Sequence, residues 1–258
     1  MKDFRRQEVY ARKRMRQPMA RAVRLTNDLF RLAIRVVQNS EPQPTTAGRV
    51  MRFMLTRLFN DVRAAQIAAQ TAYPIQAIAL TANAFELAYR ALYICDDDVE
   101  AEKWALHDNL RKSYPDNLMK AVVAVYQNRG LSRQAAEQIY RNRYTPLAAA
   151  KHANPKVLTN FGLKQEADTL HIYFGPAVDD GVIKACRVAL LECNRVLGLA
   201  LSTFIWFHMP EQRVALHPAV RSHFRRTQRF GLSLQGLVPA LAAVRDDHGD
   251  SALLPPQE

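Results

Sequence analysis

The stretch Asn83-Ala-Phe-Glu-Leu-Ala-Tyr-Arg-Ala-Leu-Tyr93 indicates the fold class of this chain. Its longer polar and amphipathic side chains, Glu86, Tyr89, Arg90 and Tyr93, recur at i, i+3, i+4 and i+7, which places them on one face of a helix. Nearly every other position of the stretch is apolar. A helix that is apolar almost all round is buried among other helices. The stretch therefore predicts a helical bundle.

Glu86 is the most informative residue of this helix, because a carboxylate inside an apolar helix needs partners. Two interpretations are open. Glu86 forms a structural ion pair with Arg90 and contacts a tyrosine, or it belongs to a site with His152. Either way we expect Glu86 to be buried and to contact Arg90, His152 or a tyrosine.

Composition extends the helical prediction to the whole chain of 258 residues. Hydrophobic residues make up 48%, there are only 9 glycines, and Ala, Leu and Arg, which favour helix, are abundant. The predicted fold is all-α, a multi-helix bundle. The predicted helices span residues 19–37, 49–72, 75–95, 99–112, 116–128, 132–141, about 146–153, 180–208 and 218–230.

One β-hairpin interrupts the helices. Val157–Phe161 and Thr169–Phe174 are β-prone runs on either side of Gly162–Asp168, so we expect a short hairpin near 157–174. The domain prediction has three parts: a basic arm and linker over 1–45, a helical bundle over 46–245 and a disordered tail over 246–258. Pro18 is expected to break any helix at the start of the arm.

The formal net charge of +12 indicates an anionic partner, either nucleic acid, an acidic protein or an anionic membrane surface. Arginine dominates the excess, and its guanidinium makes forked contacts to phosphate. Phe224 and Phe230 lie among the C-terminal arginines and either stack on bases or belong to the core. The candidate nucleic-acid-binding residues are Arg12, Lys13, Arg14 and Arg16 in the arm, and Arg221, Arg225, Arg226 and Arg229 near the C-terminus.

A second candidate site lies in Tyr144-Thr-Pro-Leu-Ala-Ala-Ala-Lys-His-Ala-Asn-Pro155. His152 could transfer a proton near neutral pH, Lys151 could stabilise negative charge, and Asn154 could orient the imidazole. The alternative is an ordinary helix C-terminus, where cations are favourable. Adjacent helical residues point about 100° apart, so Lys151 and His152 do not face one site without help.

Several classes of function have no support in the sequence. Glycine-rich nucleotide-binding loops, His-Glu-x-x-His, Cys-x-x-Cys and Gly-x-Ser-x-Gly are all missing, so we expect no cofactor. The histidines near the C-terminus are too loosely spaced to predict a metal site. The three cysteines predict buried thiols in a reducing compartment, hence a cytoplasmic protein. The most apolar stretch, Val196–Phe207, is shorter than the roughly 20 residues of a membrane span, so none is expected.

Three short motifs carry a resemblance: residues 84–94, Ala-Ala-Lys-His-Ala-Asn-Pro (149–155) and Tyr-Phe-Gly-Pro (173–176). Over residues 50 to 208 the chain resembles an uncharacterised bacterial all-helical family that is itself similar to HEPN domains. HEPN domains are helical bundles, often dimeric, and include ribonucleases of defence and toxin systems. The resemblance implies a helical fold and a homodimer. The spacing from Arg143 to His152 is longer than in the HEPN signature, so nuclease activity is supported less than the fold.

These observations give two functional hypotheses. The first is a non-catalytic helical module that binds nucleic acid, with RNA favoured, or a protein partner through its basic faces. The second is a metal-independent, HEPN-like ribonuclease that uses His152, Lys151, Asn154 and Glu86. Binding ranks first because the basic charge is certain, whereas the catalytic set depends on Glu86 and His152 being close together.

Overall fold

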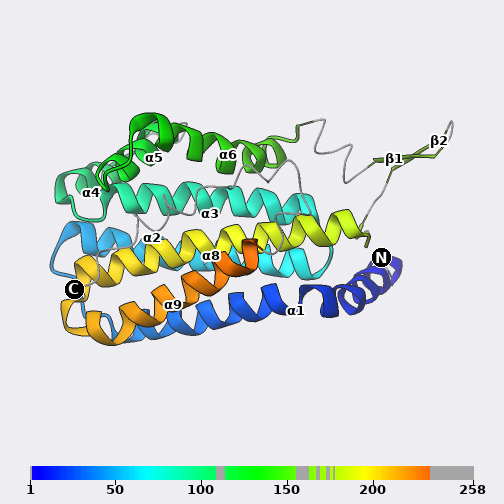
Figure 1. The fold of residues 1–258 in the computed structure, drawn as a ribbon, viewed down its shortest axis with the longest axis horizontal. Helices are drawn as coiled ribbons and strands as arrows, with labels where there is room; N and C mark the ends of the chain where they lie inside the picture. Colours follow the sequence, from blue (N-terminus) through cyan, green and yellow to red (C-terminus); the bar gives the residue numbers. More distant parts are fainter. Residues whose placement is uncertain are drawn as a thin grey trace.

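The computed structural model describes residues 2–108, 114–154, 163–166, 169–172, 175–176 and 178–232, and it is a helical bundle (Figure 1). The predicted all-α class is confirmed. The α-helices are α1 (Lys2–Asn39), α2 (Thr46–Gln70), α3 (Pro74–Ile94), α4 (Asp98–Ala105), α5 (Leu118–Gln127), α6 (Arg133–Lys151), α8 (Asp180–His208) and α9 (Arg213–Leu232). A single 3₁₀ turn, η1 (Pro210–Gln212), precedes α9.

α8 lies at the centre of the bundle, where α1, α2, α3 and α9 all pack against it. Every residue from Cys193 to Ile205 is buried, as expected for a helix that is apolar on all sides. α5 and α6 form a layer beyond α3, on the side away from α1 and α9, and α4 packs against α2 and α3 at one end of the bundle (Figure 1). The bundle therefore has two outer layers, α1 with α9 and α5 with α6, on either side of its centre.

By length and composition α8 could also cross a membrane, and among the described residues it is the only helix that could. Its most apolar window is longer than the Val196–Phe207 stretch considered in the sequence, because it includes residues from the N-terminal half of the helix. Of that window, 83% is buried inside the bundle, which is the position of a core helix.

Side-chain caps fix where the helices begin. Asp97 accepts hydrogen bonds from the backbone N–H groups of Val99 and Glu100 at the start of α4, and Ser132 accepts one from Ala135 at the start of α6. Asp97 is one of three consecutive aspartates and Ser132 directly precedes α6, and both residue types are favoured at an N-cap. Asp98 has a different role, since its Oδ1 accepts from the Ala47 N–H of α2 at 2.7 Å.

The expectation that Pro18 breaks the first helix is wrong, because α1 continues through it. The missing proline N–H removes one backbone hydrogen bond. The surroundings compensate in two ways. Arg187 of α8 donates from Nε and Nη2 to the Pro18 carbonyl at 2.8 and 2.5 Å. A continuous buried stripe on α1 also crosses the proline and packs against α8; it consists of Ala11, Met15, Met19 and Ala22.

α6 and the hairpin also differ from expectation. α6 runs through Pro146 as one helix, where the sequence predicted two pieces. Strands β1 (Leu163–Glu166) and β2 (Thr169–Ile172) pair antiparallel, with Leu163 opposite Ile172 and Glu166 opposite Thr169. β1 falls where the sequence placed the connection. Residues 157–161, the predicted first strand, and 246–258, the predicted tail, lie outside the described residues.

Three histidines of α8 and α9 connect these helices to each other and to their neighbours; His217 and His223 are buried and His208 is half-buried. Burial lowers the pKa of each, and for His217 the nearby Arg221 and Arg213 add to the effect, which brings it to about 4. Each ring is therefore neutral at pH 7. The Nε2 atoms of His208, His217 and His223 lie 2.6, 2.8 and 2.8 Å from the Cys95 carbonyl, the Ser202 hydroxyl and the Leu25 carbonyl, respectively.

We predict that these three histidines make the fold acid-sensitive. Unfolded histidine has a pKa near 6.5, so below that pH the unfolded chain binds protons that the folded chain does not bind, because its histidine pKa values are lowered. Stability is then lost as the pH falls from about 6.5 toward 4, by about 3 kcal/mol for His217. Urea denaturation at a series of pH values measures this loss. His217→Gln keeps a polar group beside Ser202 and should flatten the pH dependence; an unchanged slope would contradict the assignment.

Candidate functional site

α1 and α9 together form a strongly basic face. α9 packs beside α1, so the two arginine clusters that are far apart in the sequence become neighbours. α9 contains no acidic residue, and the acids of α1 are Asp3, Glu8 and Asp28. The exposed basic side chains of this face are Arg5, Arg6, Arg12, Lys13, Arg14, Arg16, Arg21, Arg24, Arg31 and Arg35 of α1, and Arg225, Arg226 and Arg229 of α9.

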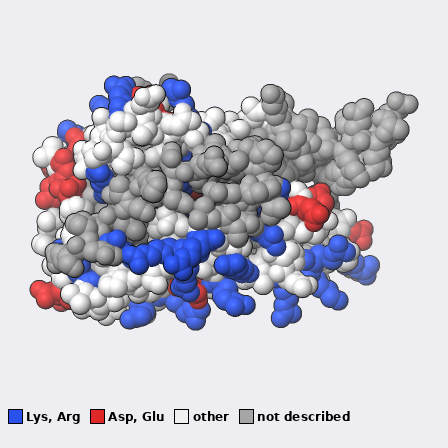
Figure 2. Space-filling view, in the orientation of Figure 1, with Lys and Arg blue, Asp and Glu red and all other residues white. Residues whose placement is uncertain are grey.

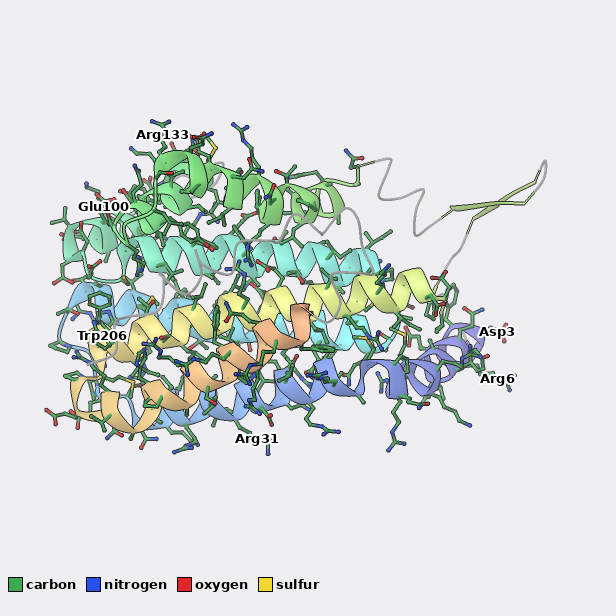
Figure 3. All side chains as sticks on the ribbon, viewed as in Figure 1. Asp3, Arg6, Arg31, Glu100, Arg133 and Trp206 are labelled. Atoms are coloured by element: carbon green, nitrogen blue, oxygen red, sulfur yellow. The ribbon has the colours of Figure 1, made fainter. Side chains whose placement is uncertain are left out.

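The charge is visible along one edge of the molecule. Lys and Arg side chains gather where α1 and α9 lie (Figure 2). Arg6 and Arg31 of α1 extend from this edge, whereas Arg133 lies at the opposite edge on α6 (Figure 3). Asp28 is the acid within the face, and it pairs with Arg31 at 2.5 Å and with Arg226 at 3.2 Å. Asp28 therefore joins the two helices. Most of the other exposed cations of this face form no ion pair with the described residues.

The two phenylalanines of α9 belong to the core. Phe224 is 1% and Phe230 is 6% exposed, so the interpretation that they stack on bases is wrong. The Arg21 guanidinium of α1 lies 4.6 Å from the centre of the Phe230 ring, which is a cation–π contact between the two helices. Arg221 is half-buried, and its three neighbours in the predicted cluster are exposed.

Glu86 lies at the α3–α6 interface and is surrounded by donors. Its Oε1 accepts hydrogen bonds from the Tyr144 hydroxyl and from Lys151 Nζ, both at 2.6 Å, and its Oε2 accepts from Arg90 Nη1 at 3.2 Å. The Glu86 side chain is 13% exposed. The expected contacts with Arg90 and a tyrosine are thus confirmed. The Lys151 contact is one that the sequence did not predict.

These donors control the ionisation of the cluster. Burial raises the pKa of Glu86, but the hydrogen bonds from Lys151 and Tyr144 and the charges of Lys151 and Arg90 outweigh it. The pKa of Glu86 therefore lies below its usual value, and the carboxylate stays ionised. Burial, followed by the hydrogen bond to Glu86, raises the pKa of Tyr144. The arrangement stabilises a carboxylate between three donors rather than a proton-transfer group.

His152 lies outside this cluster. It caps the C-terminus of α6 and is exposed, and within the described part of the chain its side chain is not a partner of Glu86. Ala153 then adopts a left-handed conformation with φ of 51°, and the Asn154 N–H donates to the Ala149 carbonyl at 2.8 Å. This is a Schellman motif. Because adjacent residues diverge on a helix, Lys151 turns toward α3 and His152 toward solvent.

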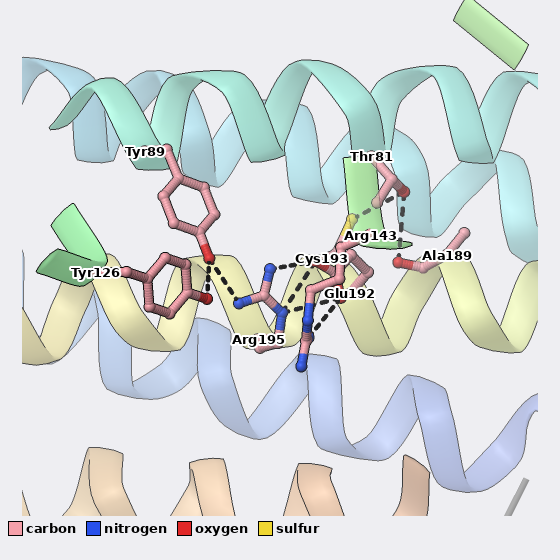
Figure 4. A network of polar contacts seen from close by, with 8 residues as sticks. All are labelled: Thr81, Tyr89, Tyr126, Arg143, Ala189, Glu192, Cys193 and Arg195. Atoms are coloured by element: carbon pink, nitrogen blue, oxygen red, sulfur yellow. Dashed lines mark hydrogen bonds and ion pairs between the residues drawn. The ribbon is translucent and has the colours of Figure 1, made fainter. Parts of the chain in front are cut away.

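A second polar network lies deeper, and the sequence did not reveal it (Figure 4). Glu192 of α8 accepts from Arg195 Nε at 2.9 Å to each carboxylate oxygen and also pairs with Arg195 Nη2. Arg143 of α6 pairs with the same carboxylate at 3.4 Å. The Arg143 and Arg195 side chains are about 5% exposed or less. One carboxylate thus compensates two buried guanidinium groups.

Tyrosines extend the network to α3 and α5. Arg195 Nη1 donates to the Tyr89 hydroxyl at 3.1 Å, and that hydroxyl lies 2.7 Å from the hydroxyl of Tyr126 (Figure 4). The network therefore joins α3, α5, α6 and α8. The only local signal was the i, i+3 pair Glu192 and Arg195 in an otherwise apolar helix. Arg143 comes from a different helix, so its membership depends on tertiary structure.

The remaining candidate groups are possible metal ligands and the three cysteines. Among the described residues, no group of three or more His, Cys, Asp or Glu side chains is arranged to hold a metal ion. The three cysteines are free and buried, and burial raises the pKa of Cys186 to about 12.

A scan against protein-family models, a search of curated proteins and a search of solved structures found no match.

We predict that the charge of Glu192 is essential for stability. Glu192→Gln keeps the size of the side chain but removes the carboxylate that two buried guanidinium groups share, which should cost about 3–5 kcal/mol. Glu137→Gln is the matched control, because Glu137 also bridges two arginines, Arg133 at 2.8 Å and Arg141 at 3.8 Å, on the exposed side of α6. Urea denaturation should show a large loss for Glu192→Gln and almost none for the control. Equal midpoints for the two variants would contradict a structural role for the network.

Proposed function

We propose that this protein is a helical module that binds nucleic acid, with RNA favoured, through the basic face of α1 and α9. The observation that supports the proposal is the position of its arginines: two clusters on separate helices face the same side of the molecule with few acids among them. Such a surface attracts phosphate and releases counterions when phosphate binds. Arginine suits this contact better than lysine because its donors form a planar fork.

The arginines of α9 are available for this contact. Arg225, Arg226 and Arg229 are exposed, while neighbouring residues of α9, such as Phe224, Thr227 and Phe230, anchor the helix in the core. Removing the three charges leaves this packing in place and removes the Arg226–Asp28 ion pair, which at this exposure contributes at most about 1 kcal/mol. An acidic protein would be attracted by the same charges, but the binding proposed here is to the nucleic-acid backbone.

We predict that binding to RNA weakens steeply with salt and that Arg225→Gln/Arg226→Gln/Arg229→Gln flattens this dependence. Each lost phosphate contact should lower the slope of log K against log salt by roughly 0.7–0.9. Fluorescence anisotropy with a labelled RNA between about 50 and 200 mM salt measures the slope. The control is Lys120→Gln/Arg133→Gln/Arg141→Gln, which removes three charges from the α5–α6 layer. If both triple variants have the same slope, the α9 arginines do not contact the phosphates.

The alternative function, metal-independent RNA cleavage, would depend on His152. Its exposure at the end of α6, beside Lys151, is the observation in its favour. Against it, Lys151 is engaged with Glu86, and Glu86 is not positioned to orient the imidazole. Cleavage through His152 would therefore need a second group beside the imidazole in place of Glu86. That group would be Lys151 or a group of the RNA itself.

We predict that His152→Ala leaves the melting temperature and RNA binding nearly unchanged, because the side chain is exposed and the turn is held by backbone hydrogen bonds. If the protein cleaves RNA through His152, the same variant abolishes cleavage and EDTA has no effect. Cleavage that persists in the folded variant, or that EDTA stops, would exclude this mechanism. RNA that stays intact with the wild-type protein favours the binding module.

A further inference from the structure

We propose that the basic face of α1 and α9 binds the sugar-phosphate backbone of a nucleic-acid double helix. This inference rests on the proposed function and specifies its ligand: a duplex rather than a single strand. Three features of the described residues support it, namely the spacing of the cations on α1, the way the bundle holds that helix, and the kinds of side chain that surround the cations.

The first feature is a stripe of five cations, Arg6, Lys13, Arg24, Arg31 and Arg35, along α1. Their spacings of 7, 11, 7 and 4 residues bring them within about 40° of one another around the helix axis. All five are exposed. Measured along the helix, which passes through Pro18, the stripe is about 44 Å long, since a helix rises 1.5 Å per residue. A double helix has a regular array of phosphates along its length, and about 44 Å corresponds to about 13 base pairs of B-form DNA.

The second feature is that the bundle fixes the position of α1. The side of α1 opposite the stripe is buried, and α1 also makes polar contacts with α8 and α9. His223 of α9 donates to the Leu25 carbonyl at 2.8 Å, and Asn194 of α8 donates to the Thr26 hydroxyl at 3.1 Å. A long array of cations held in fixed positions loses little conformational entropy on binding a stiff partner.

The third feature is the small number of exposed aromatic side chains along the face. Within residues 11–39 of α1 and 213–230 of α9, the three phenylalanines, Phe30, Phe224 and Phe230, are all buried, and the exposed rings of α1, Phe4 and Tyr10, lie near its N-terminus. Proteins that bind single strands without sequence preference commonly combine a basic groove with exposed aromatic rings on which bases stack. Here the exposed residues along the stripe include Gln17, Ala20, Asn27 and Gln38, which suit contact with a backbone.

An anionic membrane surface fits this face less well. A helix that lies in a membrane interface inserts its apolar side among the lipids. The apolar side of α1 is instead covered by the bundle: Leu29 and Val36 are in the main core, and Met15 and Met19 pack with residues of α8. The exposed large apolar side chains of α1 are Phe4, Val9, Tyr10 and Ile34, so the charges of the stripe would act on a membrane with little burial of apolar surface.

The test compares four labelled ligands in one buffer: a 16-base-pair RNA duplex, a DNA duplex of the same sequence, the single RNA strand, and vesicles containing anionic lipid. We expect both duplexes to bind at least tenfold tighter than the single strand and to compete with one another. RNA duplexes of increasing length should gain affinity until they span the stripe, near 13 base pairs by the B-form estimate, and little beyond. Tighter binding of the RNA duplex supports RNA as the source of the backbone; tighter binding of the DNA duplex supports DNA.

The decisive variant is Arg6→Gln/Lys13→Gln/Arg24→Gln/Arg35→Gln, which removes four cations of the stripe and spares Arg31, the partner of Asp28. Its matched control, Lys103→Gln/Lys120→Gln/Arg133→Gln/Arg141→Gln, removes four charges from α4, α5 and α6. We expect the stripe variant to lose at least tenfold in duplex affinity at 0.15 M salt, and the control to lose less than threefold.

Each other result has a distinct meaning. Single-stranded RNA binding as tightly as the duplex, or equal losses in the two quadruple variants, would overturn the duplex inference and leave nucleic-acid binding in place. Vesicles that bind while both duplexes do not would replace it with a membrane surface. Failure of every nucleic acid to bind at 50 mM salt would overturn the proposed function itself. Circular dichroism and melting temperatures of both variants verify that each is folded.

Discussion

α8 is surrounded by α1, α2, α3 and α9, and the rest of the structure depends on its burial. Its apolar residues contribute to the core from every side, so each surrounding helix needs one apolar stripe to join the bundle. This explains why α1 continues through Pro18. The hydrophobic stripe on both sides of the proline stabilises the helix by more than the missing backbone hydrogen bond costs, and Arg187 adds a contact to the Pro18 carbonyl.

The same burial explains the charges inside the molecule. Glu192 and Arg195 lie on the buried helix, and a buried charge is tolerated only when it is paired and hydrogen-bonded. Arg143 and Tyr89 complete this requirement from α6 and α3. Nearer the surface, Glu86 repeats the pattern with Lys151 and Tyr144. One set of polar contacts in the core and one nearer the surface therefore fix the outer layer of α5 and α6 on α3, and they account for Glu86 and Lys151 without a catalytic role.

Because one side of α1 and of α9 is occupied by the core, their arginines are directed to the other side. A basic surface then follows from the amphipathic pattern of the two helices. Its distance from Glu86 and Lys151, which lie on the α3–α6 side, separates the two candidate sites of the sequence. Binding through α1 and α9 and chemistry at His152 are therefore independent hypotheses, and variants of one should leave the other unchanged.

The sequence by itself determined the helical class, most helix positions and the contact between Glu86 and Arg90, because all of these depend on neighbours within a few residues. Tertiary structure decided the continuation through Pro18, the burial of Phe224 and Phe230, and the meeting of Glu86 with Lys151. It also joined Arg143 to Glu192 and brought α9 beside α1. These features depend on which helices pack together, and local periodicity shows that a helix has a buried side without showing which helix covers it.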